Sequence, residues 1–147
     1  MKIFLDDLRT PVDKDWTIVR DFHQFCNLIQ KVGLENIEMI SFDHDLGDTA
    51  VKEYFANTKD NYVIDYDNIH EKTGYDCAKW LVNYYYANYD FSRSHKFQKG
   101  SPIVFPYVVV HSANPVGSAN IMGYVNNFLK NERQEQHCVR VRIEHTV

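Results

Sequence analysis

Apolar runs of strand length alternate with helical patterns along most of this 147-residue chain. Five runs have the length and composition of strands, at residues 2–5, 16–20, 37–42, 103–111 and 138–143. A parallel pair of strands needs a long crossover connection, which is usually a helix. The alternation therefore predicts a single α/β domain, residues 1–147, built on a mainly parallel five-stranded sheet.

Three segments between these runs have helical spacing. Residues 21–32 place apolar side chains on one face, and Gly33 follows as a typical residue just beyond a helix end. A second helix is predicted at about residues 74–89. A third begins at Asn114 and Pro115, which suit an N-cap and a first turn.

Three other segments lack a helical pattern. Residues 6–15 are few and contain Pro11, so no helix is expected between the first two strands. Residues 48–72 are polar, rich in tyrosine and without clear periodicity, which predicts a long variable insertion or lid without regular structure. Residues 90–102 have the composition of a polar connection.

Composition argues against several classes of protein. The net charge of −4 and the pI of about 5.9 disfavour a broad basic surface that binds duplex DNA or RNA. Because no run reaches transmembrane length and no signal-peptide pattern is found, a cytoplasmic protein without membrane contact is expected. Cys26, Cys77 and Cys138 lie far apart among apolar neighbours, and we expect buried free thiols rather than zinc ligands.

Polar residues concentrate just after three of the predicted strands, where open parallel sheets usually bind ligands. They are Asp6, Asp7 and Arg9 after the first strand, Asp43, His44 and Asp45 after the third, and His111, Ser112 and Asn114 after the fourth. The second strand is followed only by Arg20 and Asp21, and the last by no comparable group. Each group alone has a structural explanation as a turn, a cap or a hydrogen-bonded histidine. Their coincidence at one sheet edge predicts a functional site.

The carboxylates allow two interpretations. Asp6, Asp7 and Asp43 could supply oxygen ligands to Mg²⁺ or Mn²⁺. Alternatively, the carboxylates could orient the histidines by hydrogen bonds, and the site would then work without a metal. The sequence leaves both open.

The other residues suit chemistry on a phosphodiester. His44 and His111 could act as general base and general acid, and we expect their rings to face one cleft. Arg9 could bind a phosphate with two hydrogen bonds. The free N–H groups of the helix that begins after Asn114 provide a further anion site.

The stretch "FLDDLR", followed by Asp43 at a later strand end, resembles the receiver domain of two-component signalling. In that domain an acidic pair after the first strand and an aspartate after the third hold Mg²⁺ and accept a phosphoryl group. Asp6, Asp7 and Asp43 have the same order here. The first receiver helix is reduced or missing, however, and no Lys-Pro pair follows the last strand. His111 stands where threonine or serine is usual, with Ser112 next to it.

A closer resemblance is to the cyclic-phosphate processing receiver domain family. Its blocks are matched in order by "LDDLRTP", "SFDHDLG", "TGYD" with "WL", and "VHSANPVG" with a later Met. The resemblance implies a flavodoxin-like or receiver-like three-layer sandwich with sheet order 2-1-3-4-5. It also implies hydrolysis of cyclic phosphates, either RNA 2′,3′-cyclic ends or cyclic nucleotides. Carried over by position, the site residues are Asp6, Asp7, Arg9, Asp43, His44, Asp45, His111, Ser112 and Asn114.

Together, the residues and the resemblance predict a phosphodiesterase. The predicted catalytic residues are Asp43, His44 and His111, and the predicted substrate-binding residues are Arg9, Asp45, Ser112 and Asn114. RNA repair and the degradation of a cyclic nucleotide signal are both open as its role. Two alternatives are a protein that sequesters a nucleotide without cleaving it and a phosphoacceptor receiver that signals through Asp43.

Overall fold

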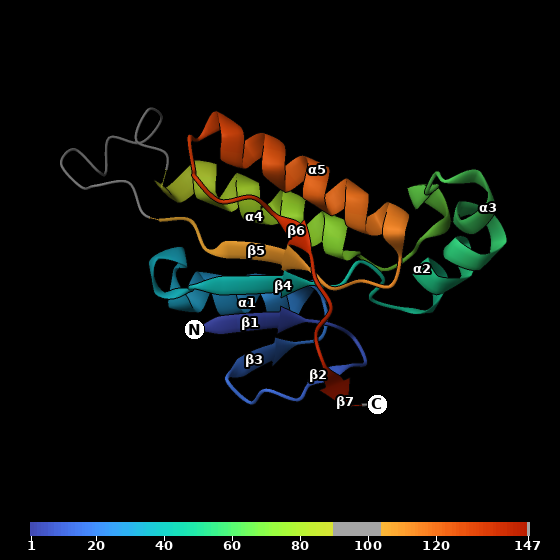
Figure 1. Ribbon diagram of the computed structural model, residues 1–147, viewed down its shortest axis with the longest axis horizontal. Coiled ribbons are helices and arrows are strands. Elements are labelled where there is room, and N and C mark those ends of the chain that lie inside the picture. Colours follow the sequence, from blue (N-terminus) through green and yellow to red (C-terminus); the bar gives the residue numbers. More distant parts are fainter. Residues whose placement is uncertain (90–103, 147) are drawn as a thin grey trace.

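The computed structural model describes residues 1–89 and 104–146, and its centre is a parallel sheet (Figure 1). The strands of this sheet are β1 (Lys2–Leu5), β3 (Trp16–Val19), β4 (Met39–Phe42), β5 (Tyr107–Val110) and β6 (Val139–Arg140). Their order is β3-β1-β4-β5-β6 and every neighbouring pair is parallel. In chain order this is 2-1-3-4-5, so the predicted α/β class and strand order are confirmed. The predicted strand 103–111 is shorter, and the predicted connection 90–102 lies outside the described residues.

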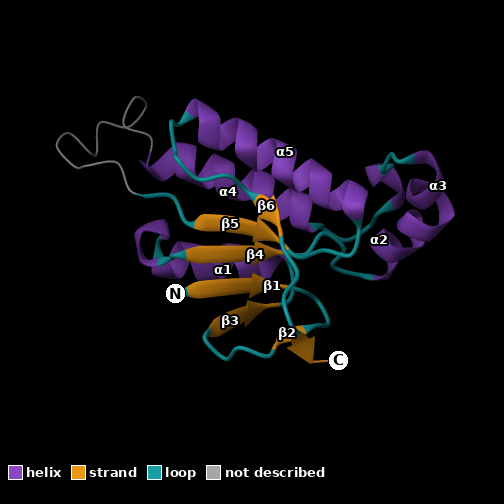
Figure 2. Ribbon diagram, in the orientation of Figure 1, coloured by secondary structure: helices purple, strands orange, loops and turns teal. Residues whose placement is uncertain are grey.

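Three long helices pack against one face of the sheet (Figure 2). They are α1 (Phe22–Val32), α4 (Gly74–Tyr89) and α5 (Pro115–Asn131), and a short 3-10 helix, η1 (Leu34–Asn36), follows α1. Each long helix joins two strands whose crossover runs in the same direction along the sheet, and right-handed crossovers then place all three on one side. Their apolar side chains form one core with alternate strand residues such as Leu5, Phe42 and Val110.

The opposite face of the sheet has no helix in the described part of the chain. Only the connection from β1 to β3 would place a helix there, and residues 6–15 contain just the two-residue strand β2 (Thr10–Pro11). The predicted absence of a helix at this place is therefore confirmed. The described chain has two layers where the family resemblance implied three.

The insertion at residues 48–72 is more regular than predicted. It contains α2 (Asp48–Glu53), the π-helical turn η2 (Tyr54–Thr58), α3 (Lys59–Asn61) and the 3-10 helix η3 (Tyr66–Asn68). The buried carboxylate of Glu53 accepts hydrogen bonds from the side chains of Asn57 and Asn68 and from the backbone N–H of Asp65. These contacts are polar, so the helices of this segment leave no apolar periodicity in the sequence. The expectation of a segment without regular structure was wrong.

The C-terminal segment departs from the predicted strand 138–143. It leaves the sheet after β6, crosses the carboxyl ends of the strands, and ends in β7 (His145–Thr146), which pairs antiparallel with β2 (Figure 1). Backbone hydrogen bonds from Val141 to Val110 and from Val12 to Glu144 hold it at both ends. We call residues 141–146 the C-terminal strap.

The structure also bears on the cysteines and on membrane-spanning helices. Cys26, Cys77 and Cys138 are buried free thiols, as predicted. The described helices include none with the length and apolar character needed to cross a membrane.

Candidate functional site

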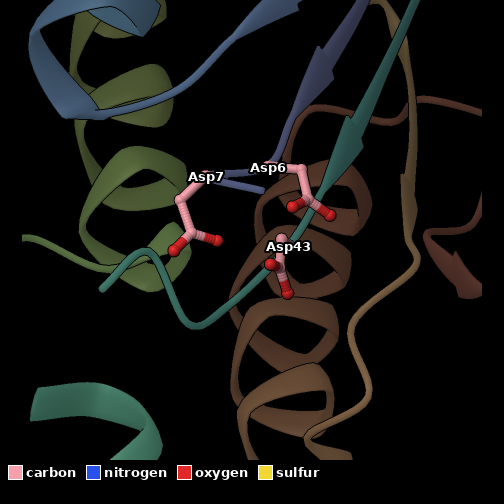
Figure 3. Close-up of side chains that lie close together, drawn as sticks. All are labelled: Asp6, Asp7 and Asp43. Carbon is pink, nitrogen blue, oxygen red and sulfur yellow. The ribbon is translucent and has the colours of Figure 1, made fainter. Parts of the chain in front are cut away.

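Three carboxylates meet beyond the ends of β1 and β4. One oxygen atom from each of Asp6, Asp7 and Asp43 lies within 4.8 Å of the others, and Figure 3 shows the three side chains around one small space. Asp6 and Asp7 follow β1 directly, and Asp43 follows β4, the strand paired with β1. The ends of β1 and β4 therefore lie side by side, as predicted, and bring the three carboxylates together. We call these residues the acidic cluster.

Asp6 is held as an ionised group. Its Oδ1 accepts hydrogen bonds from the backbone N–H groups of Leu8 (2.9 Å) and Arg9 (2.7 Å). Its Oδ2 accepts from Arg9 Nε (2.8 Å) and His111 Nε2 (3.0 Å). Burial alone would raise the pKa of Asp6, but these hydrogen bonds and the charge of Arg9 lower it to about 2. Asp6 is thus a fixed anion and a structural support of the cluster.

Asp43 behaves in the opposite way. Its side chain is almost fully buried. Among the described residues, only Oδ1 has polar partners: it accepts a hydrogen bond from the His44 backbone N–H (2.8 Å) and forms an ion pair with Arg9 Nη2 (3.4 Å). Burial and the neighbouring charge of Asp6 raise the pKa of Asp43 to about 7, although Arg9 opposes the shift. A carboxyl group with a pKa near neutrality is suited to proton transfer at physiological pH.

Asp7 completes the acidic cluster and is partly exposed. Burial and the charge of Asp6 raise its pKa. Asp6 already accepts four hydrogen bonds, which use its lone pairs, so a cation would be held mainly by Asp7 and by Oδ2 of Asp43. Those two carboxylates fit the oxygen-ligand chemistry of Mg²⁺ or Mn²⁺.

Two arginines shape the loop that carries Asp6. Arg9 lies between Asp6 and Asp43 and forms an ion pair with each. Arg20, at the end of β3, donates to the backbone carbonyls of Asp6 (3.1 Å) and Arg9 (2.7 Å) and to the Thr10 hydroxyl (2.8 Å). Sequence reasoning gave Arg20 no part in the site, because a lone arginine after a strand carries no motif.

His111 is packed on the open face of the sheet. Its ring stacks on Phe4 with centroids 4.2 Å apart, and its Nδ1 lies 2.7 Å from the Ser41 hydroxyl. Burial lowers the pKa of His111 despite the opposing effect of Asp6. A neutral ring that donates Nε2–H to Asp6 and accepts at Nδ1 from Ser41 satisfies every contact. His111 therefore orients Asp6.

His44 is buried on the helical side. Its Nδ1 lies 2.6 Å from Asp45 Oδ1, and its Nε2 lies 3.0 Å from the Tyr66 hydroxyl, which also accepts from Asn120. Asn114 donates to the same oxygen of Asp45 (3.2 Å). The ring is completely inaccessible to solvent, and both nitrogens are used.

Two glycines allow this burial. A Cβ on Gly117, in the first turn of α5, would lie 2.3 Å from the His44 ring. A Cβ on Gly74, the first residue of α4, would lie 1.8 Å from the carbonyl oxygen of Asp43. Thr73 and Asp76 form a reciprocal capping box at the same helix start. The "TGYD" and "NPVG" blocks thus set the close approach of both helices to the end of β4.

The two histidines do not face one cleft, contrary to expectation. His111 lines a large cavity at the carboxyl ends of the strands, and His44 is not among its lining residues. Gly117 covers the His44 ring on the side of α5, whereas Phe4 lies against His111. The difference arises because His111 points to the open face of the sheet and His44 to the helical face.

The large cavity has a volume of about 950 Å³ and basic walls. Arg9, His111 and Ser112 line it, and the C-terminal segment contributes Arg140, Arg142 and His145, among others. The expectation that the last strand contributes no comparable group was therefore wrong. The alternating arginines of "RVR" are a signal in the sequence, although the same alternation is typical of a strand with one solvated face.

The remaining predicted site residues, Ser112, Asn114 and Asp45, form hydrogen bonds to other residues of the protein. The Asn114 side chain caps α5 by accepting from the Gly117 N–H (2.9 Å). The Ser112 hydroxyl accepts from the Asn114 N–H (3.1 Å), and the Ser112 carbonyl accepts from Arg140. Asp45 and Asn114 also line a smaller cavity of about 180 Å³ against the insertion, beside Tyr54.

The fold and the acidic cluster define the class as a receiver-like α/β domain. The chain belongs to the family described as Cyclic-phosphate processing Receiver domain, whose match covers residues 1–127. Comparison with curated proteins and with solved structures gave no match.

Proposed function

We propose that this domain hydrolyses cyclic phosphodiesters, with Asp43 as the catalytic base. The observation that carries the proposal is the Asp43 carboxyl group, whose pKa burial raises to about 7 and which lies beside the Arg9 guanidinium. Arg9 also lines the basic cavity, and although Asp43 itself is not a lining residue, an anionic ligand bound to Arg9 is drawn towards the carboxylate through the ion pair of Arg9 with Asp43. Membership of a family tied to cyclic-phosphate processing supports the substrate class.

In the proposed reaction, Arg9 binds an anionic oxygen of the cyclic phosphate. Ionised Asp43 takes a proton from water, and the water oxygen attacks phosphorus. One ring P–O bond breaks, and the leaving oxygen takes a proton from solvent in the open cavity. The product is a phosphomonoester with a free hydroxyl group.

The histidines act as positioning groups in this mechanism. His111 holds Asp6, whose charge helps to raise the pKa of Asp43. His44 ties Asp45 to Tyr66 of the insertion. The predicted acid–base pair of histidines is replaced because both nitrogens of each ring already have partners.

A divalent cation would add to this site. Asp7 and Asp43 would hold Mg²⁺ or Mn²⁺, which would stabilise the charge that develops on the phosphate. The cation would also lower the pKa of Asp43, so the role of Asp43 as base belongs to the metal-free site. Asp6 and Arg9 remain bound to each other in either case.

The test is a screen of 2′,3′-cyclic mononucleotides, RNA with a cyclic-phosphate end, and cyclic di- and oligonucleotides, with and without EDTA. The proposal expects at least one of these to be converted to a monoester by the wild-type protein and not by Asp43→Asn. Ligand recovered intact from a tight complex would indicate sequestration instead. A stable acyl phosphate on Asp43 after incubation with a small phosphodonor would favour the receiver alternative.

A further inference from the structure

The C-terminal segment contributes two arginines, Arg140 and Arg142, to the cavity, and neither has an ion-pair partner in the described part of the chain. Arg9 is paired with Asp6 and Asp43. Apart from the paired Arg9, the cavity is lined by two arginines and one glutamate, Glu144, although the whole chain has a net charge of −4. The local excess of positive charge suits an anionic ligand.

The backbone of this segment and the side chain of Arg140 are held in place. Arg140 donates from Nε (3.2 Å) and Nη2 (2.9 Å) to the Ser112 carbonyl oxygen. The strap that carries Arg142 is fixed at one end by Val141 and at the other by the pairing of β7 with β2. The backbone of the strap is therefore anchored at both of its ends. A cationic group that is already held in place, as Arg140 is, loses less entropy on binding a phosphate.

The cavity is larger than one phosphate group requires. Its volume of about 950 Å³ lies near the upper end of ordinary ligand pockets, which are roughly 300–1,000 Å³. Arg9 is tied to the acidic cluster by its ion pairs, whereas Arg140 and Arg142 belong to the C-terminal segment and have no such tie. The cavity therefore has room for a ligand that carries charge at more than one place.

We propose that Arg140 and Arg142 form a second phosphate subsite, which selects ligands that carry a further phosphate besides the cyclic one. The inference rests on the proposed function, because it assigns the cyclic phosphate to Arg9 and Asp43. The shared chemistry is a cyclic phosphate joined to another phosphate, as in an RNA end or in a cyclic oligonucleotide. The family match ends at residue 127, so both arginines lie beyond the part of the chain that it covers.

The experiment compares three probes on the full chain. They are a cyclic 2′,3′-mononucleotide, a dinucleotide that ends in a 2′,3′-cyclic phosphate, and a cyclic dinucleotide. Dissociation constants are measured by calorimetry and ring opening by ³¹P NMR. We expect at least one two-phosphate probe to bind wild type about tenfold or more tightly than the mononucleotide, and the stronger of the two identifies the source of the ligand.

The variant Arg142→Gln should remove most of this advantage while leaving the affinity for the mononucleotide unchanged. Lys130→Gln is the charge-matched control, because Lys130 lies in the last turn of α5, at the far end from the site. Equal affinity for all three probes, or an equal loss for all three in Arg142→Gln, would overturn the subsite. Ring opening without any preference would leave the proposed function standing and reject the subsite. Preferential, Arg142-dependent binding without ring opening would support the subsite and reject the proposed function.

Discussion

His111 donates its Nε2–H to Oδ2 of Asp6 at 3.0 Å, which joins residues 105 positions apart at the ends of β5 and β1. The contact is buried and lies beside the ion pair of Asp6 with Arg9. As a result, the two buried carboxylates of the acidic cluster have opposite pKa shifts. Asp6 is stabilised as an anion, and burial together with the Asp6 charge raises the pKa of Asp43 to about 7.

Asp6→Ala should therefore destabilise the fold, although carboxylate crowding alone suggests that its removal is harmless. The substitution leaves the His111 ring and the Arg9 guanidinium without their acceptor. Because Arg9 is partly exposed and keeps its ion pair with Asp43, the cost should lie below the roughly 3–5 kcal/mol of a fully buried pair, at about 1–3 kcal/mol. Urea unfolding near neutral pH measures the change, with Asp7→Ala as the control. Equal and small effects of both substitutions would refute a structural role for Asp6.

Asp43→Asn should stabilise the fold, and more so at high pH. The pKa of Asp43 is raised from 3.8 to about 7 on folding, so the unfolded chain loses this proton first as pH rises. The folded state is therefore penalised progressively between these two values and fully above the higher one. Each pKa unit is worth about 1.4 kcal/mol, so the gain should reach a few kcal/mol at alkaline pH. A gain that is the same at about pH 5 and about pH 8 would contradict the raised pKa.

Gly117→Ala tests the packing of α5 on His44. The added Cβ would lie 2.3 Å from a ring that is fixed at both nitrogens, and overpacking of this kind costs roughly 1–3 kcal/mol. Gly123→Ala, in the same helix, is the matched control, since its Cβ would meet nothing within 4 Å. That control should gain up to about 1 kcal/mol from helix propensity. Thermal melts of the two variants should shift in opposite directions, and two upward shifts would mean that His44 is not confined.

Binding of a divalent cation to Asp7 and Asp43 should stabilise the protein. At a Mg²⁺ concentration of one hundred times the dissociation constant, the gain should be about 2.7 kcal/mol. Asp7→Asn should abolish the gain while Asp48→Asn, at the start of α2, retains it. If neither Mg²⁺ nor Mn²⁺ changes the melting temperature, the cluster works as carboxylates alone, and any turnover should survive EDTA.

The parallel α/β class and the acidic cluster could be predicted from the sequence because both follow from local patterns, whereas the strand order was implied by the family resemblance. Apolar runs mark the strands, and parallel strands bring Asp6 and Asp43 to one edge wherever the intervening chain goes. The direction of each histidine could not be predicted in this way. His44 and His111 both follow strands, yet neighbours distant in the sequence, Gly117 and Phe4, cover the two rings on opposite faces.

Two other features depend on long-range contacts without a periodic signal. The helices of the insertion are organised around one buried carboxylate, that of Glu53. The C-terminal strap reaches the site only because it pairs with Thr10 and Pro11, far away in the sequence. Neither contact leaves an apolar repeat from which it could be inferred.

The most direct test is the pH dependence of cyclic-phosphate ring opening, followed by ³¹P NMR for wild type and Asp43→Asn. If Asp43 is the base, the wild-type kcat/KM should rise with pH through an apparent pKa near 7, because only the ionised carboxylate accepts the proton from water. Loss of the base should lower turnover by roughly 10² to 10⁴ while binding is retained. Undiminished turnover in Asp43→Asn, or a wild-type protein that opens no cyclic phosphate, would contradict the account.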